Sequence, residues 1–324
     1  MEEIDLKDRK ILYELDTNSR QSFSRLGKKV GLHKDVIAYR VKKLQEKGII
    51  KCFYTEIDDY KLGYLRYRFY FKYQYSDPVI KEEIINFFIK NKYTRIIHST
   101  EGHYNLVVIS DVKGISKCFS VWETIIKKYR EYFSDQVFSI IFKAYIYRYS
   151  FLLDRKNKDR EVRIKSILYG SDEIIKIDDL DNQILKIISQ NSRIQTIEIA
   201  KKLNTTAITI KNRIKKLKEA GVIKAFRINI ALPKLGYHRY KVDIILKDYE
   251  KLQKIIKYIE KNPNLDEVVL SIGHADLELI FILNNADQLR KIMDDLETKF
   301  PDTIKNYNHF NATKTYKWSW IPEE

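Results

Sequence analysis

Two stretches of the chain decide the fold, because the second repeats the first. Residues 6–20 read LKDRKILYELDTNSR, and residues 26–53 read LGKKVGLHKDVIAYRVKKLQEKGIIKCF. The same plan returns 173 positions later as LDNQILKIISQNSR (180–193) and IAKKLNTTAITIKNRIKKLKEAGVIKAF (199–226). Aligned without a gap, residues 4–67 match residues 177–240 at 27 of 64 positions. Identity at a fixed offset over this length marks an internal repeat. The chain is therefore one unit that has been duplicated.

The first part of each unit has the pattern of a winged helix-turn-helix domain. Apolar residues at helical spacing predict helices over 6–15, 22–30 and 34–47, and residues 49–57 read as a strand. Gly31 and Gly48 stand where the second and third helices should end. The second copy predicts the same elements over 180–188, 196–203, 207–220 and 222–230. Two short helices, a turn, a third helix and a β wing describe this DNA-binding motif.

The second part of each unit predicts the order β-α-β-β-α-β. In the first copy the elements fall at 64–75, 78–91, 93–100, 105–112, 115–133 and 137–143. In the second they fall at 237–246, 249–262, 267–272, 277–283, 287–300 and 304–316. This order is the ferredoxin-like arrangement. The aromatic residues of 67–75 alternate with polar ones, and we expect them to pack in a core or an interface rather than to stack on bases.

The fold class that follows is α+β, with two winged helix-turn-helix domains alternating with two ferredoxin-like domains. The predicted boundaries are 1–62 and 177–235 for the helix-turn-helix domains and 63–150 and 236–324 for the ferredoxin-like domains. A charged linker is expected over 151–176, which reads FLLDRKNKDREVRIKSILYGSDEIIK.

Composition and charge narrow the classes of partner. The 324 residues are 44% hydrophobic and 32% charged with only five prolines, a composition that favours packed cores over a disordered chain. The net charge is +16, which favours a polyanion such as nucleic acid. Residues 1–75 and 174–245 carry +6 and +9, whereas 76–173 and 246–324 carry +4 and −3. The excess is greatest in the two helix-turn-helix parts, as expected if those parts meet the polyanion.

The two long stretches resemble the DNA-binding part of the Lrp/AsnC (feast/famine) transcriptional regulators, here in tandem-duplicated form. The residues that carry the resemblance are the D-x-x-I-L opening, the N-S-R, the R-[VI]-K-K-L and the G-[IV]-I-K of each copy, and KLGY at 61–64 and 234–237. The resemblance covers about 60 residues in each copy. One departure is His33, which stands where the family usually has a small hydroxyl residue, whereas the second copy keeps Thr205 and Thr206.

The third helix of each copy is expected to lie in the major groove of DNA. Short or polar side chains at its N-terminal end would reach base edges, and lysines further along would touch phosphates. Asn212 could pair with adenine and Lys211 could donate to guanine. For Arg40 and Arg213, bonding the protein's own backbone and bonding a phosphate both remain open. The expected DNA-binding residues are His33, Lys34, Tyr39, Arg40, Lys42, Lys43, Thr205, Thr206, Lys211, Asn212, Arg213, Lys215 and Lys216.

The resemblance also implies a small-molecule site in the ferredoxin-like parts. The family has a G-x-x-D turn between the two central strands, near an effector that is amino-acid-like. Here the turn reads Gly273-His274-Ala275-Asp276 in the second copy and Gly102-His103-Tyr104-Asn105 in the first. The candidate effector-binding residues are Gly102, His103, Asn105, Gly273, His274 and Asp276. Neither histidine has a Cys, His or acid at ligand spacing, so we expect turn histidines rather than metal ligands.

Other signals in the sequence are absent. The chain has no apolar run of membrane-spanning length, no signal-peptide core, no P-loop and no clustered zinc ligands. Cys52 and Cys118 make no redox or metal spacing and suit a reducing compartment. We therefore expect a cytoplasmic protein without cofactor, metal or membrane partner.

The function that the sequence favours is a sequence-preferring regulator that binds double-stranded DNA. Because one chain holds both copies, the two ferredoxin-like domains could pair internally into a single-chain pseudo-dimer, and further homo-oligomers remain open. Two alternatives remain. One is a DNA-architectural protein. The other is an enzyme resembling the haem-biosynthesis decarboxylases that share this fold, with His98, His103 or His274 as its candidates. We expect no enzyme.

Overall fold

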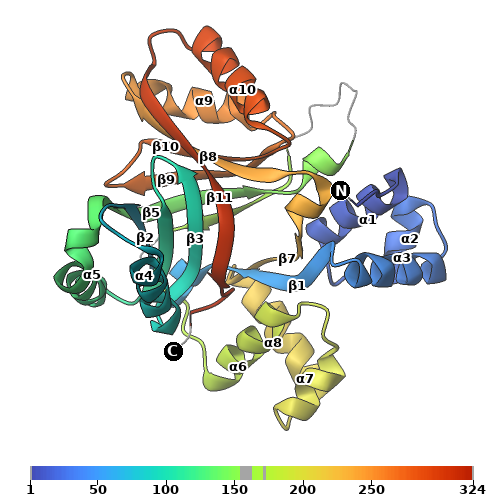
Figure 1. Ribbon diagram of the computed structural model, residues 1–324. Coiled ribbons are helices and arrows are strands. Elements are labelled where there is room, and N and C mark those ends of the chain that lie inside the picture. Colours follow the sequence, from blue (N-terminus) through green and yellow to red (C-terminus); the bar gives the residue numbers. More distant parts are fainter. Residues whose placement is uncertain (1, 154–162, 171–172, 323–324) are drawn as a thin grey trace.

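The computed structural model describes residues 2–153, 163–170 and 173–322 (Figure 1). Each copy begins with three helices and a strand. In the first copy these are α1 (Leu6–Thr17), α2 (Phe23–Val30), α3 (Lys34–Glu46) and β1 (Ile50–Ile57). In the second they are α6 (Asp179–Gln190), α7 (Thr196–Lys202), α8 (Ala207–Glu219) and β7 (Ile223–Ile230).

Local sequence signals explain where these helices begin and end. Asp5 and Asp178 cap the first helix of each copy, and each side chain accepts a bond from the backbone N–H three residues later. Ser22 caps α2 in the same way. Gly31 follows α2 at φ 71°, a left-handed conformation that favours glycine. The three-helix parts therefore form where the sequence predicts them.

The rest of each copy is the predicted β-α-β-β-α-β unit. The first has β2 (Leu65–Tyr73), α4 (Pro78–Lys90), β3 (Thr94–Gly102), β4 (Leu106–Val112), α5 (Ile115–Tyr129) and β5 (Phe133–Tyr147). The second has β8 (His238–Leu246), α9 (Leu252–Ile259), β9 (Leu265–Ile272), β10 (Leu277–Leu283), α10 (Ala286–Lys299) and β11 (Ile304–Trp318). The α+β fold class is thus confirmed.

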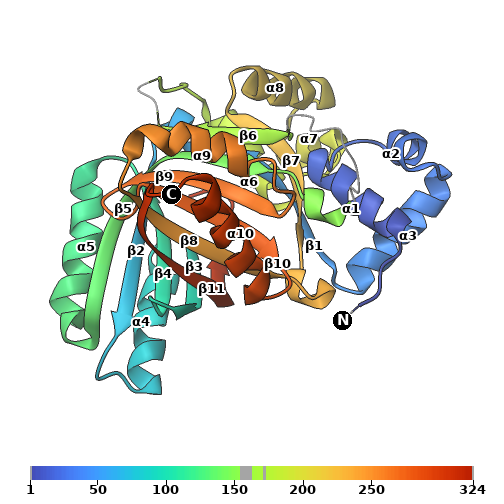
Figure 2. The same ribbon diagram turned by 90° about the horizontal axis from the view of Figure 1, so that it is seen from above.

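The two units share one sheet that closes on itself. Its order is β2-β4-β3-β11-β8-β10-β9-β5, and β5 pairs again with β2. The units meet where β11 pairs with β3 and where β5 pairs with β9. All of these pairs are antiparallel. The result is a closed barrel of eight strands, half from each copy (Figures 1 and 2).

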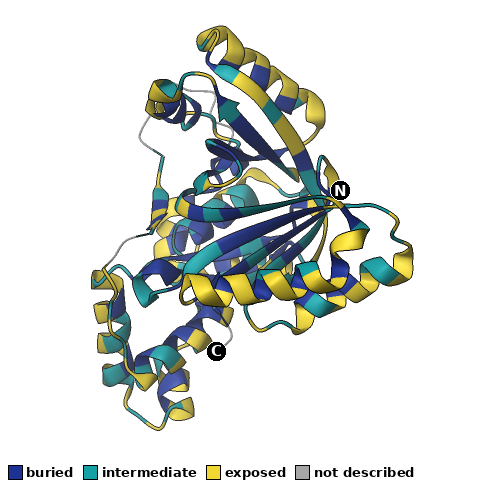
Figure 3. Cartoon of the chain, turned by 90° about the vertical axis from the view of Figure 1, so that its left-hand side faces the viewer, coloured by how far each residue is buried: buried dark blue, intermediate teal, exposed yellow. Residues whose placement is uncertain are grey.

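Alternation along each barrel strand separates two kinds of side chain. On β2, Tyr67, Phe69 and Phe71 are buried in a core formed with α4 and α5. Arg66 and Arg68, which alternate with these aromatic residues, line the barrel interior. The strands are largely buried beneath helices whose outer faces are exposed (Figure 3). The aromatic residues Tyr67, Phe69 and Phe71 therefore lie in a core, as expected. The other face of β2, which carries Arg66 and Arg68, faces a cavity.

The last strand of each unit is longer than the sequence predicts. We expected 137–143 and 304–316, whereas β5 and β11 each have 15 residues. Each strand pairs with its own unit along one part and with the other unit along the rest. Another addition is β6 (Lys165–Tyr169), which lies in the segment expected as a linker and pairs with β5. Residues 154–162 and 171–172 of that segment lie outside the described residues.

Candidate nucleic-acid interface and barrel cavity

Most of the residues expected to bind DNA lie on the exposed faces of α3 and α8. The exposed ones are His33, Lys34, Tyr39, Lys42, Lys43, Thr206, Lys211, Asn212, Lys215 and Lys216. Lys42 and Lys215 are 78% and 74% exposed, and each faces a glutamate four residues on, at 3.7 Å. Such surface pairs contribute little to stability, and they leave the lysine ammonium groups accessible to another partner. Both helices therefore present a polar, lysine-bearing face to solvent.

Arg40 and Arg213 bind within the protein. The Nη1 of Arg40 donates to Asp5 and Asp8 at 2.7 and 2.8 Å. The Nη1 of Arg213 donates to Asp178 and Asp181 at 2.6 and 3.2 Å. In each copy the arginine joins the third helix to the N-terminus of the first. Its partners are carboxylates, whereas the sequence had left open the protein backbone or a phosphate.

The two third helices begin differently. Thr206 caps α8, and its Oγ1 accepts a bond from the N–H of Thr209 at 3.1 Å. His33 occupies the same position before α3 and makes no capping bond. Its Nδ1 lies 3.2 Å from a carboxylate oxygen of Asp35 instead. The departure at His33 therefore changes both the helix cap and the exposed side chains at the start of the third helix.

The N-S-R motifs of the two copies bind each other. Ser19 and Ser192 share a hydrogen bond of 2.5 Å between their hydroxyls. Arg20 donates to the carbonyl of Ser192, and Arg193 donates to that of Ser19. Beside them β1 pairs antiparallel with β7 to form a two-stranded ribbon, hereafter the wing ribbon. The two helix-turn-helix parts are thus fixed to each other by hydrogen bonds within one chain.

A buried arginine ties the wing ribbon to both copies. Arg227 on β7 is 1% exposed. It bonds both carboxylate oxygens of Asp16 at 2.8 and 3.0 Å, and Glu56 at 3.0 Å. It also donates to the carbonyl of Tyr147 on β5 at 3.0 Å. Sites 173 residues apart are equivalent, and the equivalents of this group are Tyr54, Ser189 and Asn229. The network therefore exists on one side of the repeat only.

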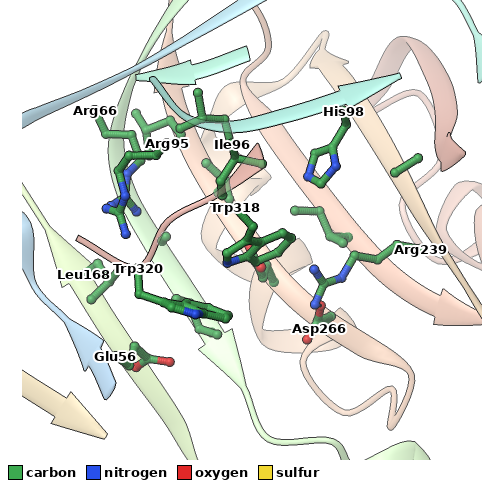
Figure 4. A pocket seen from close by; sticks show the side chains of 18 of the residues that line it. Glu56, Arg66, Arg95, Ile96, His98, Leu168, Arg239, Asp266, Trp318 and Trp320 are labelled. Atoms are coloured by element: carbon green, nitrogen blue, oxygen red, sulfur yellow. The ribbon is translucent and has the colours of Figure 1, made fainter. Parts of the chain in front are cut away.

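The barrel encloses a cavity of about 200 Å³. One end is lined by the wing ribbon, including Tyr54 and Glu56. At the other, Val107 and Phe310 line it beside Tyr70 and Tyr104. Trp318, the last residue of β11, and Trp320, two residues later, reach into the space between the charged walls (Figure 4). A barrel of eight strands has room inside for one small ligand.

Charged side chains in and around the barrel interior form ion pairs in which two cations share the same carboxylates. Arg66 and Arg95 both bond Asp59 and Asp111. The charges of these arginines outweigh burial and lower the pKa of Asp111, whereas burial raises the pKa of Asp59 despite them. Arg68, on the same strand as Arg66, and Lys241 of β8 both contact Glu278 of β10. Burial lowers the pKa of Lys241 to about 7, so this lysine loses its proton far more easily than one at the surface.

The two turns expected to bind an effector use their side chains for the fold. Asn105 accepts a bond from the N–H of Tyr73 at 2.9 Å, and Asp276 accepts one from Leu246 at 2.7 Å. His274 contacts Asp243 at 2.7 Å, whereas His103 is more exposed and lies 3.7 Å from Asp135. The turns approach each other, because the rings of Tyr104 and His274 are 5.6 Å apart. They close one end of the barrel.

Sequence reasoning missed the cavity and most of its lining. The signal that was available is the alternation of Arg66 and Arg68 with aromatic residues, which indicates a polar face on a strand. Which residues of the other strands share that face depends on strand pairing. Of the three histidines considered for catalysis, His98 lines the cavity. Among the residues that the structure describes, no group of three metal-ligating side chains comes together.

Both helix-turn-helix parts match known families of DNA-binding domains. Residues 4–45 match the AsnC-type helix-turn-helix domain, and residues 177–224 match a winged helix-turn-helix DNA-binding family. A helix-turn-helix-type transcriptional regulator of Pyrococcus furiosus is 34% identical over 119 residues, which are 37% of this chain and 80% of that protein. The chain belongs to the Lrp/AsnC family. The regulator LrpB of Bacillus subtilis is 29% identical over 122 residues, or 38% of this Lrp/AsnC chain and 82% of LrpB.

Solved structures show how the whole Lrp/AsnC chain is arranged. The siroheme decarboxylase NirDL covers 98% of it with a TM-score of 0.66 and 16% identity, and 94% of NirDL is covered in turn. At this identity the likeness is one of fold. AsnC of Escherichia coli covers 43% of the chain with a TM-score of 0.39 and 26% identity, and 94% of AsnC is covered. No helix in the described part of the Lrp/AsnC chain is both long and apolar enough to cross a membrane.

Proposed function

We propose that this chain is a transcriptional regulator that binds double-stranded DNA with sequence preference and acts as a single-chain pseudo-dimer. The observation that carries the proposal is the pair of exposed third helices, α3 and α8, held on one shared wing ribbon. A pair of recognition helices at a fixed separation reads two half-sites on one face of DNA. The relatives of the chain are named as transcriptional regulators, which supports the same function.

The one-sided Arg227 network supports pairing of the two copies within one chain. In a pair made of two first units, Tyr54 would replace Arg227 beside Asp16 and Glu56. Asp16 would then be buried without a cation, and Glu56 would keep only Arg148 at 3.7 Å, which costs several kcal/mol. The copies have diverged into complementary halves, and this divergence favours the intrachain pair over a symmetric one.

On DNA, we assign the lysines to phosphates and the N-terminal ends of the helices to bases. Lys42, Lys43, Lys215 and Lys216 lie along the exposed faces and would position the domains. His33, Lys34 and Tyr39 of the first copy, and Thr206, Lys211 and Asn212 of the second, would face base edges. Arg40, Arg213 and the half-buried Thr205 support the helices in this assignment rather than touch DNA.

We expect Asn212→Ala to relax the preference at one base position. A bidentate pair between asparagine and adenine contributes about 1–3 kcal/mol of discrimination, which alanine cannot supply. Selection of bound duplexes from a random pool, with wild type and variant side by side, measures the change. An equal loss of affinity for selected and random DNA would show that Asn212 does not read a base.

We expect the operator to be asymmetric. The recognition surfaces differ, with Ala38 and Tyr39 in one copy where Lys211 and Asn212 stand in the other. The half-sites should be unlike and one helical turn, or a small multiple, apart. Footprinting on a selected duplex tests this, and the same sequence protected under both copies would contradict the pseudo-dimer. Equal affinity and equal salt dependence on selected and random DNA would instead favour an architectural protein.

One observation favours a second candidate function. The cavity, with His98 and several arginines in its lining, lies in a fold shared with a siroheme decarboxylase whose structure with an iron-uroporphyrin analogue is known. A decarboxylase-like chain would bind iron-uroporphyrin III with a change in its visible absorption and release carbon dioxide. For a regulator we expect neither result, and the titration separates the two functions without DNA.

A further inference from the structure

The ionisable side chains that line the barrel cavity are mainly basic. Six basic side chains line it and three acidic ones. The basic ones are Arg66, Arg68, Arg95, Arg227, Arg239 and Lys241, and the acidic ones are Glu56, Asp266 and Glu267. Burial also raises the pKa of Glu267. Other carboxylates, such as Asp111 and Glu278, bond the arginines but do not themselves line the cavity. The lining that a ligand would touch therefore holds more guanidinium donors than carboxylate acceptors, which suits a ligand that accepts hydrogen bonds.

One arginine in the cavity has a donor to spare. The Nη2 of Arg239 pairs with Asp266 at 2.7 Å. Its Nε is buried and has no hydrogen-bond partner among the described residues. A buried donor without a partner costs free energy that a ligand can recover. Arg66, the equivalent residue of the first copy, has its Nε and Nη2 bonded to Asp111 and Asp59.

His98 lies near Arg239 on the same side of the cavity (Figure 4). Its Nδ1 is 2.9 Å from the hydroxyl of Thr315. Burial, with the positive charges of Arg239 and Arg68, lowers the pKa of His98 to about 4. The ring is therefore neutral near pH 7 and can form a hydrogen bond without adding charge.

Two indoles of the chain already occupy part of this space. Trp320 stacks on Tyr54 of the wing ribbon, with ring centroids 3.6 Å apart and an angle of 11°. Trp318 lies 5.2 Å from Trp320, and the guanidinium of Arg239 lies 5.8 Å from its ring centroid. Between them Ser319 is held to Arg95 through its N–H and its carbonyl, at 2.8 and 3.2 Å. The cavity therefore offers flat aromatic surface beside a free cationic donor.

We propose that the barrel interior binds a small aromatic carboxylate. Its carboxylate takes the free Nε–H of Arg239, and its ring stacks against the indoles of Trp318 and Trp320. Because Trp320 rests on Tyr54 of the wing ribbon, occupancy changes the contact between the barrel and the helix-turn-helix parts. The change in DNA affinity that follows rests on the proposed regulatory function, whereas ligand binding does not. The site is distinct from the two turns, Gly102–Asn105 and Gly273–Asp276.

The chain offers a specific fluorescence probe for this site. It has three tryptophans, and the third, Trp122, packs on Phe69 outside the barrel. In a Trp122→Phe variant, only the two cavity indoles emit. We would titrate this variant, without DNA, with phenylacetate, with its uncharged isostere phenylacetamide, and with the cation phenethylamine. Excitation at a wavelength that phenyl groups do not absorb keeps the signal to the two indoles.

We expect phenylacetate to change the emission and to bind at least tenfold more tightly than the other two compounds, because a charge-assisted hydrogen bond is lost in both. Arg239→Gln in the same background should weaken phenylacetate binding roughly tenfold or more. The control is Arg290→Gln, which removes an equal charge from an exposed site on α10 and should leave binding unchanged. Equal binding of the three compounds, or no response to phenylacetate, would overturn the proposal even if Arg239→Gln fails to fold.

DNA binding is then measured separately on a selected duplex, with and without saturating phenylacetate. A shift in affinity of severalfold is expected for the wild type, and Arg239→Gln should abolish the shift at the same phenylacetate concentration. Ligand binding with no effect on DNA affinity would overturn the link to the wing ribbon. A chain that binds phenylacetate but no duplex would overturn the proposed function and leave the ligand site standing.

Discussion

Replacing Arg227 by methionine should lower the free energy of unfolding by about 3–5 kcal/mol. The guanidinium is buried and bonds Asp16, Glu56 and a carbonyl of β5. Methionine fills similar space but leaves Asp16 buried without a cation, and Glu56 with only the more distant Arg148 at 3.7 Å. Unfolding in urea, followed by far-ultraviolet circular dichroism, measures the loss as a lower transition midpoint.

The control removes all the charges of the group together. Asp16→Asn, Glu56→Gln and Arg227→Met in one chain should recover much of the stability lost by Arg227→Met alone, since neutral polar groups cost less to bury than unpaired charges. Arg148 limits the recovery, because its Nη1 lies 3.7 Å from Glu56. A midpoint for Arg227→Met equal to that of the wild type would mean that the network does not hold the wing ribbon to the barrel.

Changing Lys42, Lys43, Lys215 and Lys216 to alanine should weaken binding to every duplex. Each lysine that neutralises a phosphate contributes about 0.9 to the slope of log affinity against log salt, so the slope should shrink by about 3–4. Selected and random duplexes should lose affinity alike, because phosphate contacts carry no sequence information. Titrations at two or more salt concentrations measure the slope.

The matched control carries the same change of charge elsewhere. Lys127, Lys254, Lys257 and Lys291 are exposed on the helices outside the barrel, and their replacement by alanine should leave the slope nearly unchanged. If both sets of four reduce affinity equally, the effect is one of net charge. In that case the lysines of α3 and α8 would not be the ones that contact DNA.

The local elements could be predicted because their signals lie within a few residues. The spacing of Ile11, Leu12 and Leu15 indicates α1, and these side chains are fully buried. The caps at Asp5 and Ser22 and the glycine at 31 set helix ends. The exposed faces of α3 and α8 follow from the same periodicity. What the residues on them bind stays a prediction.

The functions of the two turns show a limit of motif reasoning. The G-x-x-D pattern pointed to an effector site, yet Asp276 and Asn105 make equivalent bonds to the backbone of the preceding strand. An asparagine oxygen accepts such a bond as well as a carboxylate does. Asn105 can therefore replace the aspartate of the motif and keep the same backbone hydrogen bond, which the motif alone did not show.

The sequence by itself determined the duplication, the elements of each copy and the family to which the chain belongs. Helix periodicity, capping residues and identity at a fixed offset are local or one-dimensional properties, and they can be read from one chain. Only the tertiary structure decided that β5 and β11 each run on into the other unit, that the sheet closes, and that Arg239 and Trp318 face one cavity. Strand pairing joins residues hundreds of positions apart, and shifting its register by one residue would move every side chain to the opposite face. No local pattern specifies that choice, because it is set by the packing of both copies together.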